Sequence, residues 1–193
     1  MACRPGLIFL TVNTADCGLQ RVLSRKMETQ IRQKDLRAAD AHEGTVKDAL
    51  VGTWKLVSAT ETTKEGESRD AFGRAPTGFL TYTSDDRMIG MISHGDRKPL
   101  SIPDYVGAPP EERAEAFATF LAYAGSYKLE GSRVIHHVEA SWLENSVGTE
   151  QVRDIVKLEG DQLLLRTPLY LKAGRMVTAE LLWQRVKGAA AGR

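Results

Sequence analysis

Cysteine is scarce in this chain and absent from most of it. The 193 residues include only Cys3 and Cys17, both near the N-terminus. Without cysteine after residue 17, the body of the fold contains no disulfide, no Cys-based metal site and no Cys nucleophile. Such a composition suits a reducing compartment, so the expected location is cytoplasmic.

Long apolar runs and an excess of one charge are also missing. The apolar stretch over residues 6–12 is much shorter than the ~20 residues of a membrane helix, and no Ala-x-Ala cleavage site follows it. We therefore expect no membrane partner, and secretion through residues 1–26 is the less favoured alternative. The net charge is +1, which lacks the basic excess that nucleic-acid binders use to neutralise phosphates.

Familiar catalytic motifs are absent as well. The chain contains no Gly-x-Gly-x-x-Gly, no phosphate-binding Gly-Lys-Ser, no Gly-x-Ser-x-Gly and no His-Glu-x-x-His. His136 and His137 are adjacent in a β-type run, so they point to opposite faces and cannot share a metal ion. We expect no cofactor and no metal. The expected partner is a small-molecule ligand or substrate, bound by a monomer or homodimer.

What the sequence does contain, from Val51 onward, is a series of short β-type runs separated by turn residues. Ser84-Asp85-Asp86 is a strong hairpin signal, and Gly131 and Gly160 supply tight turns. Such runs at near-regular spacing favour a sandwich or a barrel. The eight expected strands cover residues 51–60, 78–83, 87–93, 125–129, 133–142, 147–158, 162–167 and 175–186.

Two segments depart from the β pattern. Residues 28–42 are rich in charge and alanine and predict a solvent-facing helix. Residues 110–123 begin with proline and acidic residues and continue with apolar residues at helical spacing, and Gly125 then indicates a C-terminal stop. Together these signals predict an inserted helix. This helix either packs on the flank of the sheet or closes one end as a lid, and the lid is slightly favoured. The expected domains are an N-terminal extension over 1–45, partly helical or disordered, a β domain over 46–187 and a flexible tail over 188–193.

The first and last strands carry a pattern that resembles the lipocalin signature. Gly52-Thr53-Trp54 begins the first strand, where the lipocalin indole plugs one end of the barrel, and Arg185 matches the basic residue that packs across it. Terminal strands are neighbours only if the sheet closes, so an Arg185–Trp54 contact predicts a barrel rather than a sandwich.

Longer strings, over residues 77–83, 120–127, 135–141 and 147–153, look like a bacterial and fungal lipocalin-like domain family. The resemblance extends from about Leu50 to Val186. It implies an all-β, closed up-and-down antiparallel barrel of about eight strands, of the calycin type, with an N-terminal helix and the inserted helix. Related small barrels bind apolar ligands or act as cofactor-free cyclases of natural-product pathways. We expect a small apolar or amphipathic molecule in the lumen. The alternative is a cofactor-independent cyclase or isomerase acting on a natural-product-like substrate there.

The sequence leaves two alternatives for which face of each central strand points into the barrel. An apolar lumen would contain His136, whereas a polar lumen would contain His137 and Glu139. On strand 147–158 the acidic residues are better placed outside, which favours an inward Gln151 and Arg153. An inward Arg153 implies a nearby carboxylate, either from Glu139 or from an acidic ligand group.

The candidate site residues follow from these patterns. Histidine transfers protons near neutral pH, arginine stabilises oxyanions, tyrosine and tryptophan offer polar handles, and methionine supplies adaptable apolar lining. The catalytic candidates are His137, Arg153 and Tyr127. The ligand-binding candidates are Tyr82, Met91, Tyr123, His136, Glu139, Trp142, Gln151 and Trp183.

Overall fold

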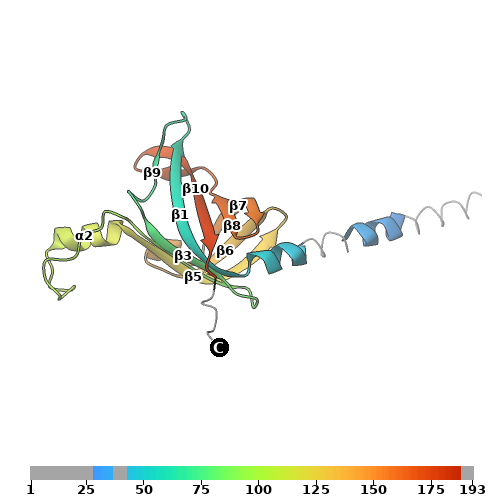
Figure 1. The fold of residues 1–193 in the computed structure, drawn as a ribbon, viewed down its shortest axis with the longest axis horizontal. Helices are drawn as coiled ribbons and strands as arrows, with labels where there is room; N and C mark the ends of the chain where they lie inside the picture. The colour runs from blue at the N-terminus through green and yellow to red at the C-terminus, as the bar shows by residue number, and fades with distance from the viewer. Residues whose placement is uncertain (1–27, 37–42, 188–193) are drawn as a thin grey trace, which may run out of the picture. The chain divides into compact units, whose positions relative to one another are not determined.

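The computed structural model describes residues 28–36 and 43–187 (Figure 1). The expectations for residues 1–27, 37–42 and 188–193, including the export alternative and the flexible tail, lie outside the described residues. Residues 28–36 form a helix that belongs to one compact unit, and residues from Glu43 onward form another. None of the described helices is long and apolar enough to cross a membrane.

The second unit is built on one sheet of ten strands, in which all the pairings between strands are antiparallel. Eight strands close into a barrel because β1 pairs with both β3 and β10, whereas the three-residue strands β2 and β9 extend it at the edges. The closed eight-stranded antiparallel barrel predicted from the sequence is therefore confirmed. The strands are β1 (Gly52–Thr63), β2 (Ser68–Asp70), β3 (Thr77–Tyr82), β4 (Arg87–Ser93), β5 (Phe120–Glu130), β6 (Arg133–Ser141), β7 (Glu150–Glu159), β8 (Gln162–Arg166), β9 (Tyr170–Lys172) and β10 (Arg175–Arg185).

Closure of the barrel brings Trp54 opposite Arg185 in the pairing of β1 with β10. Trp54 is fully buried, and the guanidinium carbon of Arg185 lies 4.0 Å from the centre of its ring, which confirms the predicted cation–π contact. Gly52 has a φ of +136°, and a Cβ there would lie 2.5 Å from Nη1 of Arg185. The glycine of the Gly-x-Trp pattern therefore makes room for the arginine.

A helix over residues 43–50 packs at this end of the barrel. Trp54 Nε1 donates to the Leu50 carbonyl at 2.9 Å, and Arg185 donates to the carbonyls of Ala49 and Val51. These bonds satisfy carbonyl groups that the end of a helix leaves without intrahelical partners. The helix end, the indole and the guanidinium together close one end of the barrel.

The strands alternate buried and exposed residues, so each contributes one face to the interior. The buried side chains near the closed end form a continuous apolar core that fills this part of the barrel. Its members include Leu50, Trp54, Leu56, Leu80, Tyr82, Met88, Tyr127, Leu129, Val134, Leu163 and Trp183.

The inserted helix is shorter than the sequence predicts. Helix α2 covers Pro110–Ala118, and strand β5 begins at Phe120, so the predicted helix over 110–123 is wrong over residues 119–123. Three of the apolar residues that gave it a helical period, Phe120, Leu121 and Ala124, pair instead with β4, along Ser93–Ile89. Tertiary pairing overrides local periodicity here, as it often does in short segments.

Gly125, which suggested the end of that helix, has a different role. It lies inside β5 at an irregularity in the pairing with β6, where a Cβ would lie 1.8 Å from the carbonyl oxygen of His137. Only glycine permits this close approach of two backbones. The signal for a break was therefore real, but it marks a β-bulge rather than a helix end.

We predict that Arg185→Met destabilises the barrel by about 2 kcal/mol, because the carbonyls of Ala49 and Val51 lose a charged donor and the ring of Trp54 loses its cation. Urea unfolding of both proteins measures the difference. The matched control is Arg166→Met, which removes an exposed pair with Glu180 and should cost less than about 1 kcal/mol. Equal effects of the two substitutions would contradict the role given to Arg185.

Candidate functional site

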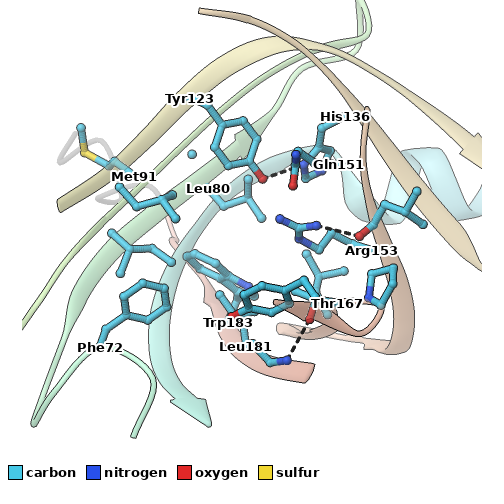
Figure 2. A pocket seen from close by; sticks show the side chains of 18 of the residues that line it. Phe72, Leu80, Met91, Tyr123, His136, Gln151, Arg153, Thr167, Leu181 and Trp183 are labelled. Atoms are coloured by element: carbon cyan, nitrogen blue, oxygen red, sulfur yellow. Dashed lines mark hydrogen bonds between the residues drawn. The ribbon is translucent and has the colours of Figure 1, made fainter. Parts of the chain in front are cut away.

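A cavity of about 380 Å³ occupies the barrel interior beyond the apolar core (Figure 2). Its lining includes Trp142, just after β6, and residues 167–170, which lead from β8 into the start of β9, but neither Leu50 nor Trp54. The cavity therefore lies toward the end opposite the Trp54 plug. Apolar lining comes from Phe72, Leu80, Ile92, Leu121, Leu165, Leu181 and Trp183, and polar lining from Tyr123, His136, Gln151, Arg153, Thr167 and Tyr170.

His136 is the most buried polar group of the lining, with 1% of its surface exposed. Its Nε2 lies 2.7 Å from the hydroxyl of Tyr82, and its Nδ1 lies 2.9 Å from the hydroxyl of Tyr123. Burial, and next the positive charge of Arg153, hold the pKa of His136 well below its usual value. The imidazole is therefore neutral at neutral pH and links two tyrosines through its two nitrogens.

Gln151 and Arg153 both reach the cavity from β7. Gln151 pairs with His136 across β6 and β7, and Arg153 lies one inward position further along, opposite Val134. Arg153 Nη1 donates to its neighbour's carbonyl, Val152 O, at 2.7 Å. Figure 2 shows its guanidinium directed into the open space of the cavity.

Arg153 does not pair with Glu139, the carboxylate suggested by the sequence. Glu139 is half exposed on the other side of the sheet, where both its oxygens accept hydrogen bonds from Arg87 at 2.7 Å. Among the described residues, no carboxylate lies within ion-pair distance of Arg153. The sequence left two possible partners for Arg153, namely Glu139 and an acidic group of a ligand. Glu139 is therefore already paired elsewhere.

Two further candidates lie away from the cavity. His137 points to the outer face, with its side chain 39% exposed and Nδ1 3.3 Å from Glu150, because adjacent strand residues alternate. Tyr127 is buried in the core, where its hydroxyl donates to the carbonyl of Thr83 and burial raises its pKa to about 12. The structure thus separates these two catalytic candidates from Arg153.

The remaining candidates fall into two groups. Trp142, Trp183, Tyr123, Gln151 and His136 line the cavity, as does Met91, whose side chain is 41% exposed. Tyr82 is buried behind His136 and reaches the lumen only through that imidazole. Burial raises its pKa well above the usual value.

Sequence reasoning missed the residues that border the cavity near β2 and β9. Phe72 and residues 167–170 belong to short segments without a β or helical period, so only Pro168 gave a local signal, and it indicates a turn. Buried Glu61 anchors these segments by accepting hydrogen bonds from Arg69 and Lys172 at 2.7 and 2.5 Å. These ion pairs hold the pKa of Glu61 below its usual value despite its burial, which opposes them.

The helix expected as a lid does not cover the cavity in this structure. None of the residues of α2 is buried, and none lines the cavity. Figure 1 shows α2 projecting beyond the ends of β4 and β5. The ring of Phe117, in α2, lies beside that of Trp142, with ring centres 6.5 Å apart. No cluster of three or more potential metal ligands occurs among the described residues.

We predict that the barrel loses stability as the pH falls below about 6.5, and that His136 contributes strongly to the loss. Its pKa is lower in the folded than in the unfolded state, so in this range the unfolded chain binds more protons. One such group contributes at most about 1.4 kcal/mol per pH unit. Urea unfolding from pH 7.5 to 5.0 should give a weaker pH dependence for His136→Gln. The control is Ile89→Phe, an exposed substitution without a titrating group, which should keep the wild-type dependence.

The family comparison agrees with this architecture. A model of the lipocalin-like domain matches residues 51–186. No curated protein matches the chain. A crystal structure of an uncharacterized protein from Bacteroides eggerthii matches with 9% identity and a TM-score of 0.38, covering 71% of this chain and 99% of that one. Because the family match takes in every strand of the closed barrel, this chain belongs to the lipocalin-like domain family.

Proposed function

We propose that this protein binds one small amphipathic molecule in the lumen of its barrel. The observation that carries the proposal is the cavity of about 380 Å³, whose walls are mainly apolar but include Arg153 and the hydroxyl of Tyr123. Small-molecule sites in proteins commonly have this size and composition, with few polar groups that fix the orientation of the ligand. A volume of this kind accepts a molecule of up to about three rings, or a short chain.

The distribution of packing in the barrel supports the same proposal. Large side chains fill the end near Trp54, whereas Gly90 and Ala179 are among the residues that line the hollow part. Cavities in a closed core cost stability through lost contacts, at about 24 cal/mol per Å³ in the large-to-small substitutions where this was measured. A volume kept open at this cost is expected where a ligand occupies it.

The cyclase or isomerase alternative has less support from the geometry. Both ring nitrogens of His136 are engaged by tyrosine hydroxyls, and its neutral form is favoured, so it offers no free base to a substrate. His137 and Tyr127 lie outside the cavity. The groups that remain at its surface are better suited to holding a ligand than to transferring its protons.

We expect N-phenyl-1-naphthylamine, a neutral fluorescent probe of apolar sites, to bind with a stoichiometry of one and to be displaced by small amphiphiles. Gly90→Phe should weaken this binding at least about tenfold, because the new ring would occupy the lumen. The backbone accepts a side chain here, since a Cβ would lie 3.4 Å from Leu80 Cδ1.

The matched control is Ile89→Phe, which adds a ring at the preceding residue, on the exposed face of the same strand. It should leave probe binding unchanged. Fluorescence titration measures both variants, and thermal unfolding checks that each is folded. Absence of saturable binding to the wild type, or equal weakening by the two variants, would overturn the proposed function.

A further inference from the structure

Three residues of the lining, Trp183, Arg153 and Tyr123, have hydrogen-bond donors without a described acceptor. Trp183 is 3% exposed and lines the cavity, and its Nε1 is the one buried side-chain nitrogen or oxygen without a partner among the described residues. An indole N–H can only donate. Leaving such a donor unpaired in a buried position costs about 1–3 kcal/mol, so its presence in the wall points to an acceptor on the ligand.

Arg153 adds a positive charge and further donors to the same space. A guanidinium has five N–H groups, and the only hydrogen bond that this one makes within the described part of the chain is to Val152 O. Glu150, the one carboxylate in the lining, is half exposed and lies 3.3 Å from His137 Nδ1 and 3.6 Å from Lys128 Nζ on the outer face. Nothing in the described lining therefore neutralises Arg153.

The tautomer of His136 makes Tyr123 a third donor. Tyr82 is 1% exposed and has His136 Nε2 as its sole described hydrogen-bond partner, so its hydroxyl hydrogen is satisfied only if Nε2 accepts. The proton of the neutral ring is then on Nδ1, which donates to the oxygen of Tyr123 at 2.9 Å. The hydroxyl hydrogen of Tyr123 is left without a described acceptor and is free to donate into the cavity.

We propose that the ligand of this barrel is a carboxylate, whose oxygens accept hydrogen bonds from Arg153, Trp183 and Tyr123 while its apolar body fills the rest of the lumen. This inference rests on the proposed function and narrows it to one chemical class. The forked guanidinium matches the two oxygens of a carboxylate. The indole N–H and the phenol O–H then donate to lone pairs of those oxygens that the guanidinium leaves free. Binding also supplies the negative charge that the described lining does not provide to Arg153.

The test compares 1-naphthaleneacetate with 1-naphthaleneacetamide, which differ in charge but hardly in shape. Isothermal titration calorimetry at pH 7.5 should give at least tenfold tighter binding of the acid to the wild-type protein, because hydrogen bonds to a charged acceptor are the stronger ones. Arg153→Gln should lose at least tenfold in affinity for the acid and keep its affinity for the amide. Trp183→Phe, which retains a ring but no N–H, should show a smaller loss of affinity for the acid than Arg153→Gln does.

The matched control is Arg87→Gln, which removes an arginine on the outer face of the barrel. It should leave the preference for the acid unchanged. Equal affinities of the wild type for acid and amide would overturn the carboxylate assignment, as would equal losses for both compounds in Arg153→Gln. If neither compound binds while N-phenyl-1-naphthylamine does, the assignment fails and the proposed function stands. If that probe also fails to bind, the proposed function fails as well.

Discussion

The contact between Arg185 and Trp54 is the interaction that the rest of this structure depends on. It lies at the end of the β1–β10 ladder, which joins the last strand to the first and closes eight strands of the sheet into a barrel. The same guanidinium bonds to the carbonyls at the end of helix 43–50 and thereby completes a plug. With one end sealed and the core packed against it, the interior toward the other end is enclosed by the same eight strands.

This asymmetry separates a packed end of the barrel from a hollow end. Large apolar side chains near the plug supply the burial that stabilises the fold, at roughly 25 cal/mol per Å² of apolar surface. The hollow end carries the groups that are costly to bury, namely Arg153, His136 and the indole N–H of Trp183. Trp183 belongs to both regions, because it packs in the core and also lines the cavity.

Much of the fold was predictable because it depends on local periodicity and on paired signals at distant positions. The alternation within strands and the turns at Gly131 and Gly160 placed most elements, and Trp54 with Arg185 indicated closure. The failures occurred where tertiary contacts outweigh local pattern. Residues 120–124 read as helical by spacing but pair as a strand, and the strands at 68–70 and 170–172 are too short to have a period.

The site was harder to predict than the fold, for a physical reason. The alternation of side chains along a strand predicts that His136 and His137 face opposite ways, but it does not predict which one is inside. That choice depends on other strands, where Tyr82 on β3 and Tyr123 on β5 provide hydrogen-bond partners for one imidazole. The acids on β7 did indicate the orientation of Arg153, because charged residues of that strand are less costly outside.

An inward arginine without a carboxylate is unfavourable for the empty barrel, and its surroundings add to the cost. Placing it beside His136 lowers the proton affinity of that ring, and hence favours the neutral form that connects the two tyrosines. If Arg153 acquires an anionic partner, its repulsion of a proton on His136 is reduced, so ligand and proton become linked through the same wall of the lumen. The positive charge of Arg153 thus also sets the directions of the hydrogen bonds at His136. Because the neutral ring donates to the oxygen of Tyr123, the hydroxyl hydrogen of Tyr123 remains a donor. The charge of Arg153, the tautomer of His136 and the donors that face the cavity therefore depend on one another.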